Sequence, residues 1–135
     1  MLDETQITDD LRTTFRGRLH FDRLTRGLYS TDASPFHTEP ALVAIPEDVE
    51  SVAELVRYCH EHGIPLAPRG AGTGLSGESL TPGIVLDLSK HFRRILSVDT
   101  DTVTVQPGVV LSDLNAALAK VGRRFAPNPA SSATC

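Results

Sequence analysis

The chain has 135 residues, a length that fits a single domain. Its formal net charge is −4 at pH 7 and its isoelectric point lies near 5.7. This acidic balance argues against nucleic acid as a partner, because no basic stripe is available to displace counterions from phosphates, and it argues against a membrane surface for the same reason. The apolar runs are too short to span a bilayer, and the acidic start does not resemble a signal peptide. We therefore expect a cytoplasmic protein.

The positions of the cysteines and histidines indicate neither a disulfide framework nor a metal site. Cys59 and Cys135 are too few for a disulfide framework and lack the spacing of metal ligands. Cys59 falls in a helical pattern and is expected to be a buried small hydrophobic residue. His60 and His62 would point to different sides of a helix, so they do not form a metal pair. We expect no metal site.

The N-terminal region is expected to be a helix and loop extension. Ile7, Leu11 and Phe15 recur at every fourth residue and predict a short helix. Residues 18–22 alternate as a strand does. Residues 29–35 are polar, and their Ser, Thr and Asp side chains favour a loop.

A strand, a helix and a strand follow in that order. The apolar run 41–45 predicts a strand covered on both faces. Apolar residues then recur at steps of three and four and predict a helix from residue 46 that ends at Gly63. Residues 64–68 predict a second strand. This order predicts a βαβ unit with parallel strands.

The stretch after this unit, Pro68-Arg69-Gly70-Ala71-Gly72-Thr73-Gly74-Leu75-Ser76-Gly77, predicts an anion-binding loop, and we call it the glycine loop. Glycine reaches positive φ without steric cost, so successive backbone amides can surround a diphosphate. The hydroxyls of Thr73 and Ser76 and the guanidinium of Arg69 add donors. A flexible glycine turn without a ligand is the alternative.

Two known glycine motifs match this loop in part of their sequence but not in their structural context. Residues 72–77 satisfy G-x-G-x-x-G, but the Rossmann motif must open a helix, whereas a turn and a strand-like run follow here. Residues 72–79 are one residue away from a Walker A loop, but Glu78 occupies the position of the phosphate-binding Lys. Both nucleotide motifs are therefore excluded.

The second half of the chain predicts an antiparallel sheet and a helix. Residues 84–88, 95–98 and 102–105 are short strand-like runs, the last two joined as a hairpin. Residues 111–121 carry leucines at helical spacing. The final segment, 126–135, is rich in small and hydroxylated residues, and the chain stops inside it. We expect a truncated chain whose incomplete sheet edges favour self-association.

Four ordered motifs resemble the flavin-binding domain of the FAD-linked oxidases, the vanillyl-alcohol oxidase and p-cresol methylhydroxylase superfamily. The similarity is greatest to the branch of D-lactate dehydrogenase and glycolate oxidase flavoproteins. The motifs are the glycine loop, Ile84–Ser89, Val105–Val109, and the closing Pro127–Pro129 with Ser131–Thr134. The loop Tyr29–Ser34 is also similar to that branch.

The resemblance implies an α+β fold in which a small parallel βαβ subdomain packs on an antiparallel subdomain, here incomplete, with FAD between them. Residues 1–40 would be the extension and residues 41–135 the FAD-binding domain. The amides of the glycine loop would wrap the FAD diphosphate. The flavin would be flanked by a second set of residues: Pro127, Ser131, Ser132, Ala133 and Thr134.

The resemblance also implies the chemistry. Some members bond FAD through a His in the glycine loop, and Thr73 stands at that place, so FAD would be noncovalent. Relatives in this branch oxidise a 2-hydroxy acid by hydride transfer to the flavin. The catalytic residues are expected in a substrate domain, and we assign none here. The alternatives are a non-catalytic fragment that binds little FAD, and another FAD-linked enzyme such as a sugar-lactone oxidase or an enolpyruvyl-sugar reductase. The reductase loop typically carries Ser-Asn where Thr73-Gly74-Leu75 stands here.

Overall fold

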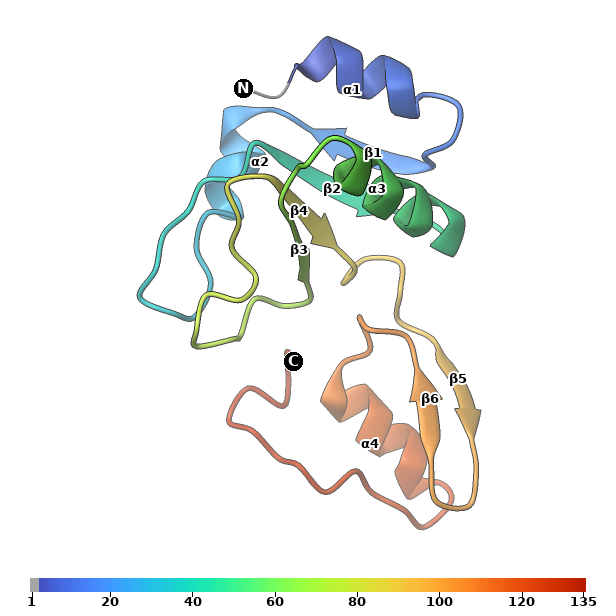
Figure 1. The fold of residues 1–135 in the computed structure, drawn as a ribbon. Helices are drawn as coiled ribbons and strands as arrows, with labels where there is room; N and C mark the ends of the chain where they lie inside the picture. The colour runs from blue at the N-terminus through green and yellow to red at the C-terminus, as the bar shows by residue number, and fades with distance from the viewer. Residues whose placement is uncertain (1–2) are drawn as a thin grey trace.

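The computed structural model describes residues 3–135 and has two parts (Figure 1). The first part is a four-stranded sheet with helices packed against it, and the second is a two-stranded sheet with one helix. The helices are α1 (Glu4–Leu11), α2 (Arg23–Leu28), α3 (Val49–Glu61) and α4 (Leu111–Ala119). The strands are β1 (Gly17–His20), β2 (Leu42–Pro46), β3 (Leu66–Arg69), β4 (Ile84–Asp87), β5 (Ile95–Val98) and β6 (Val103–Val105).

The larger sheet has the order β1-β2-β4-β3. β2 and β3 both run parallel to β4, as the βαβ unit requires, and β1 is antiparallel to β2. α1 and α3 cover one face of the sheet, where they close a single apolar core. Its buried members are Ile7, Leu11, Leu42, Ala44, Leu55, Tyr58, Cys59, Ile84 and Leu86. Cys59 is thus a buried small residue, and burial raises the pKa of its thiol to about 11.

The sequence-based assignment of residues 84–88 to the antiparallel half is wrong. β4 lies between β2 and β3, hydrogen-bonded to both in parallel register, and its residues are all buried. A strand covered on both faces is a continuous apolar run rather than an alternating one, and Ile84-Val85-Leu86 has that pattern. The predicted antiparallel half is therefore reduced to β5 and β6.

This position of β4 decides the path of the glycine loop. β3 and β4 are neighbouring parallel strands, so the chain must return from the C-terminal end of one to the N-terminal end of the other. Residues 70–83 make this return, and they contain no helix and no strand. The prediction that no helix follows the glycines is confirmed.

The N-terminal segment is tied to the start of α3 by polar contacts. The side chain of Asp48 caps the helix by accepting from the Ser51 amide at 2.8 Å. The Ser51 hydroxyl donates to Asp48 and accepts from the Arg16 amide at 2.8 Å. The hydrogen bonds from Ser51 hold the pKa of Asp48 below its usual value. The helix stops before Gly63, as predicted, and Gly63 has a left-handed conformation at φ +62°.

The smaller part consists of the predicted β5–β6 hairpin and α4. Leu114 and Leu118 are the buried residues of this helix. The segment 126–135 runs back beside α4 and ends at its N-terminus (Figure 1). There the amide of Leu111 donates to the carbonyl of Cys135, and the amide of Ser112 to that of Ser132. No helix within residues 3–135 has the length and apolar character to cross a bilayer.

The close approach of β3 and β4 gives a stability test. A Cβ at Gly83 would overlap the carbonyl oxygen of Pro65, so Gly83→Ala must push the two strands apart. We expect this variant to lose about 1–3 kcal/mol of unfolding free energy in urea denaturation. Gly27→Ala is the matched control, because no atom lies within 4 Å of its added methyl. Equal stability of the two variants would contradict the described packing.

Candidate functional site

Side chains lie directly against two glycines of the glycine loop. Gly72 has φ +68°, a left-handed conformation that other residues rarely adopt, and a Cβ there would overlap the guanidinium of Arg69. At Gly74 an added Cβ would overlap the carboxylate of Glu78. The loop is therefore a compact structure with side chains folded against its backbone, and it is not an open turn.

The loop presents unused donors. Within residues 3–135, no hydrogen bond is donated by the backbone amides of residues 70–75. Successive amides without an acceptor in their own chain form the kind of concavity that binds anions. Ser76 marks the limit of this run, because its amide donates to the Glu78 carboxylate at 3.1 Å.

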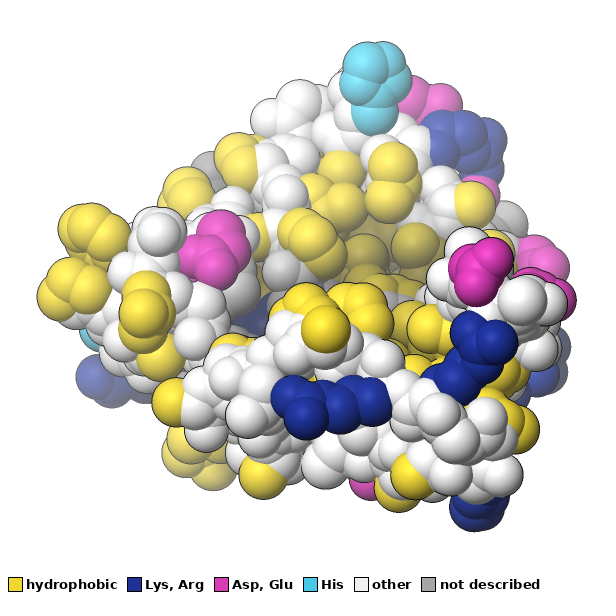
Figure 2. Space-filling model, turned by 90° about the horizontal axis from the view of Figure 1, so that it is seen from below, with side chains coloured by type: hydrophobic (Ala, Val, Ile, Leu, Met, Phe, Trp, Pro, Cys, Tyr) yellow, Lys and Arg dark blue, Asp and Glu magenta, His cyan; other side chains and the backbone are white. Residues whose placement is uncertain are grey.

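A crevice of about 270 Å³ lies between the two parts of the molecule. It is lined by residues from four segments: Gly70 and Ala71; Ser89, Lys90 and Arg93; Pro107 to Val110; and Thr134 with Cys135. Figure 2 shows that the molecule is hollowed on one face, with hydrophobic side chains in the hollow and Lys and Arg side chains beside it. The start of the glycine loop and the end of the chain thus meet at one site.

The charge in this crevice is positive. Lys90 and Arg93 line it, and no acidic side chain is among the lining residues. Arg93 pairs with Asp113 at the start of α4 at 3.2 Å, which leaves Lys90 without a carboxylate partner among residues 3–135. Unused amides on one wall and a cationic side chain on another favour a phosphorylated ligand.

Some of the residues expected at the site line the crevice, and others do not. Gly70, Ala71 and Thr134 line the crevice, whereas Thr73 to Gly77 lie outside its lining. Arg69 is half-buried beneath Gly72, and Pro68 is the exposed residue before it. In the closing segment, Ser131 and Ser132 form the turn that meets α4, Ala133 is exposed on this turn, and Pro127 is exposed farther back along the segment.

Other residues of the crevice were not anticipated as site residues. Ser89, Lys90 and Arg93 follow β4, and they reach the site because β4 is the central strand that ends beside the glycine loop. Gly108 reaches it from the turn before α4, where a Cβ would overlap the carbonyl oxygen of Leu88. A cationic side chain directly after a buried parallel strand is the signal that identifies Lys90 in retrospect.

A polar cluster lies behind the glycine loop. Asp87, 1% exposed, accepts hydrogen bonds from the Tyr29 hydroxyl at 2.5 Å and from the Ser89 amide at 2.7 Å. Burial and this hydrogen bond to a carboxylate raise the pKa of Tyr29, so the phenol stays neutral. The Arg69 guanidinium lies over the Tyr29 ring at 5.2 Å, and its Nη1 is buried with no hydrogen-bond partner among the described residues.

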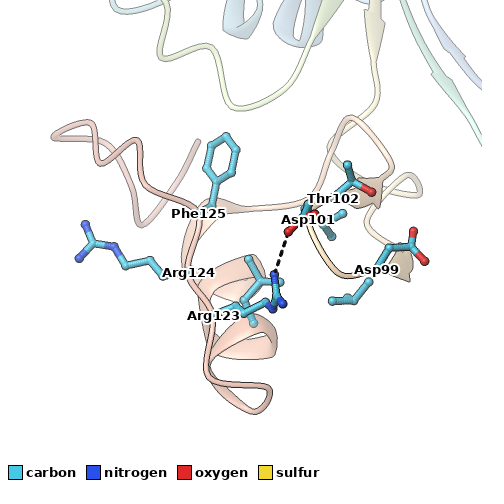
Figure 3. Close-up of a pocket in the computed structure, with 9 residues that line it drawn as sticks. Asp99, Asp101, Thr102, Arg123, Arg124 and Phe125 are labelled. Carbon is cyan, nitrogen blue, oxygen red and sulfur yellow. Dashed lines mark ion pairs between the residues drawn. The ribbon is translucent and has the colours of Figure 1, made fainter.

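A second cavity of about 230 Å³ lies in the smaller part, between the β5–β6 hairpin and the end of α4 (Figure 3). Arg123 pairs with Asp101 across it at 3.8 Å, and Arg124 and Asp99 add one charge of each sign. Because the charges balance and the glycine loop is not part of its wall, this cavity does not favour an anionic ligand.

Comparison with known families identifies the cofactor of the domain. Residues 40–135 match the family described as "FAD binding domain". The chain is a member of this family. FAD is therefore the cofactor of this FAD-binding domain, and the resemblance predicted from the ordered motifs is confirmed.

Two curated relatives show the branch of the family. D-2-hydroxyglutarate dehydrogenase of Pseudomonas putida is 42% identical over 118 residues, which cover 84% of this chain and 12% of the relative. Glycolate oxidase subunit GlcD of Bacillus subtilis is 36% identical over 134 residues, which cover 93% of this chain and 28% of the relative. The FAD-binding domain described here thus spans between an eighth and a third of the length of these proteins.

Solved structures show the same fold at lower identity. Alkyldihydroxyacetonephosphate synthase has a TM-score of 0.78 at 22% identity, over 95% of this chain and 27% of that chain. p-Cresol methylhydroxylase has a TM-score of 0.63 at 21% identity, over 77% of this chain and 22% of that chain. The p-cresol-methylhydroxylase-type fold expected for the FAD-binding domain is confirmed.

The residues present fit the anionic centre of FAD. The unused amides of residues 70–75 and the cation of Lys90 suit a diphosphate. The crevice is smaller than the pockets of about 300–1,000 Å³ that enclose drug-sized ligands, so it has room for only a part of the FAD molecule.

Glu78 allows a test of the charge in the FAD-binding domain. Its carboxylate occupies the Ser76 amide and adds a negative charge beside the loop that receives a diphosphate. Glu78→Gln keeps an oxygen acceptor and removes the charge, so we expect FAD to bind about two- to fivefold more tightly. Isothermal titration with FAD measures the effect, with Glu61→Gln on α3 as the control for net charge. Weaker binding by Glu78→Gln alone would show that the carboxylate supports the loop instead of opposing the ligand.

Proposed function

We propose that this chain is the FAD-binding part of a flavin-dependent oxidoreductase that oxidises a 2-hydroxy acid of the D-lactate or glycolate type. The observation that carries the proposal is the crevice, which is lined by Gly70 and Ala71, whose amides are unused, and by the cationic side chains of Lys90 and Arg93. The names of the two relatives supply the substrate class, because D-2-hydroxyglutarate and glycolate are both 2-hydroxy acids.

The residues that we propose to hold FAD come from two segments. Pro68 to Gly77 would bind the diphosphate, mainly through backbone amides, and Pro127 with Ser131 to Thr134 would flank the flavin. Thr73 stands where a histidyl attachment would require His, so we propose noncovalent FAD. The two unpaired cysteines support a reducing, cytoplasmic location.

FAD held by these residues would supply the redox chemistry, hydride acceptance from the α-carbon of the hydroxy acid. The residues of this chain bind and orient the cofactor. We assign no catalytic residue among them: Tyr29 is held neutral by its bond to Asp87, and Asp32 is engaged in hydrogen bonds to Ser34 and Ser79.

A second candidate is that the 135-residue polypeptide, taken by itself, binds FAD weakly and self-associates. Both outer edges of the β5–β6 hairpin lack a strand partner within residues 3–135, and Leu96 beside them is 54% exposed. Unpaired edges with apolar side chains favour association between chains.

FAD titration tests the cofactor site. Gly70 lines the crevice and has no atom within 4 Å of an added Cβ, so Gly70→Ala should fold normally while its methyl enters the space of the ligand. We expect the unmodified chain to bind FAD with micromolar affinity, measured by quenching of flavin fluorescence, and Gly70→Ala to bind about tenfold more weakly. Gly27→Ala is the control for the same substitution on α2.

Light scattering on the same samples separates the two candidates. A monodisperse monomer that binds FAD would exclude the second candidate, the self-associating fragment. Aggregates without flavin signal support the fragment and refute a complete cofactor site in this chain.

Substrate oxidation is to be tested with a polypeptide of the relatives' full length that includes this chain, because the chain covers only 12% and 28% of the two relatives. With FAD bound and oxygen removed, we expect the flavin absorbance near 450 nm to be bleached by one or more of D-lactate, glycolate and D-2-hydroxyglutarate. The L-enantiomers of the two chiral acids are the controls. Retention of the oxidised spectrum with all three acids would favour another FAD-linked enzyme, such as a sugar-lactone oxidase.

A further inference from the structure

We propose that the segment Tyr29–Thr38, called here the 29–38 loop, holds the glycine loop in its FAD-binding conformation. This inference rests on the proposed function. It concerns residues that precede the matched part of the chain, which begins at residue 40. In Figure 1 the 29–38 loop and the glycine loop lie side by side at one end of the larger sheet.

The 29–38 loop is closed on itself and so provides a firm support. Thr31 and His37 form an isolated antiparallel bridge. Below this bridge the amide of Thr38 donates to the carbonyl of Ser30 at 2.9 Å, and Ser30 is buried. At the tip, the Ser34 amide donates to Asp32 Oδ1 at 2.8 Å.

Hydrogen bonds join this support to the middle of the glycine loop and to the residues after it. The amide of Ala33 donates to the carbonyl of Gly72 at 3.0 Å. The hydroxyl of Ser79 donates to Asp32 Oδ2 at 2.9 Å. The hydrogen bonds from Ser34, and the smaller contribution from Ser79, hold the pKa of Asp32 below its usual value, so the acceptor is ionised at neutral pH.

Packing contacts hold the two ends of the glycine loop. At the end of the loop, the Phe36 ring lies so close to Gly77 that an added Cβ would be 2.9 Å from it. At the start, the Tyr29 ring supports the guanidinium of Arg69, and the Tyr29 hydroxyl is fixed by Asp87. The 29–38 loop therefore contacts the glycine loop at its start, its middle and its end.

These contacts act from behind the binding surface. No residue of the 29–38 loop is among those that line the crevice. A segment with four glycines has a large conformational freedom when it is not held, and ordering it at the moment of binding would weaken affinity. Holding the loop in advance removes this cost, so Tyr29 and Asp32, together with their partner Ser79, are positioning residues for FAD.

Ser79→Ala tests the proposal with little disturbance, because it deletes only the hydroxyl that reaches Asp32. We expect FAD affinity to fall about tenfold, the usual effect of losing one hydrogen bond to a charged group. Hydrogen exchange in the FAD-free protein should become faster at the amides of residues 70–79, while the thermal midpoint changes little. If the Ser79 hydroxyl served only the stability of the fold, Ser79→Ala would lower the thermal midpoint without a local increase of hydrogen exchange at residues 70–79.

Two further variants complete the design. Ser79→Thr retains the hydroxyl and should restore affinity. Ser97→Ala is the matched control, because it deletes a comparable serine bond, to Asp99 at 3.3 Å, on the distant β5–β6 hairpin. Unchanged FAD affinity in Ser79→Ala would overturn the proposal. If the unmodified chain bound no FAD, the proposed cofactor site would be refuted. Hydrogen exchange in Ser79→Ala would then test the further inference by itself. Faster exchange at residues 70–79 would support the holding role of the 29–38 loop, and unchanged exchange would refute it.

Discussion

β4 is hydrogen-bonded to β2 on one side and to β3 on the other, and its residues are all buried. Because the three strands are parallel, their C-terminal ends lie at one edge of the sheet. β3 enters the glycine loop at this edge, and β4 delivers Asp87 and Lys90 to the same place. The proposed cofactor site thus depends on one strand that is inserted between two others.

The glycine loop has to meet two demands that oppose each other. It must leave its amides unused, because they are to receive a phosphorylated ligand, yet a segment without internal hydrogen bonds has little to stabilise it. The structure resolves this conflict by holding the loop through other groups. The Ala33 amide, which donates to the Gly72 carbonyl, and side-chain contacts from residues 29–38 hold it, and the Arg69 guanidinium fills the space under Gly72. The donors remain unused while the backbone is fixed.

Much of this fold follows from local patterns. The helices α1, α3 and α4 are predicted by apolar spacing, and the glycine loop by its composition. The strands that pair with β4 are not predicted by such patterns, because a short apolar run such as Ile84-Val85-Leu86 fits a strand in either half of the chain. The contact between Asp32 and Ser79 joins residues 47 apart in sequence, and no local pattern encodes such a pair. Lys90 becomes a site residue only once the place of β4 is known.

The start of α4 also shapes the site, where its Asp113 pairs with Arg93. Its first amides are occupied by the carbonyls of Ser132 and Cys135, so the helix end has few donors left for a phosphate. The attraction for an anion then comes from Lys90 and Arg93, which act over a distance, while the amides of the glycine loop act only on contact. Distant charges govern how fast a ligand arrives, and close contacts govern how long it stays. Capture and retention of the flavin would therefore be separate properties, set on opposite walls of the crevice.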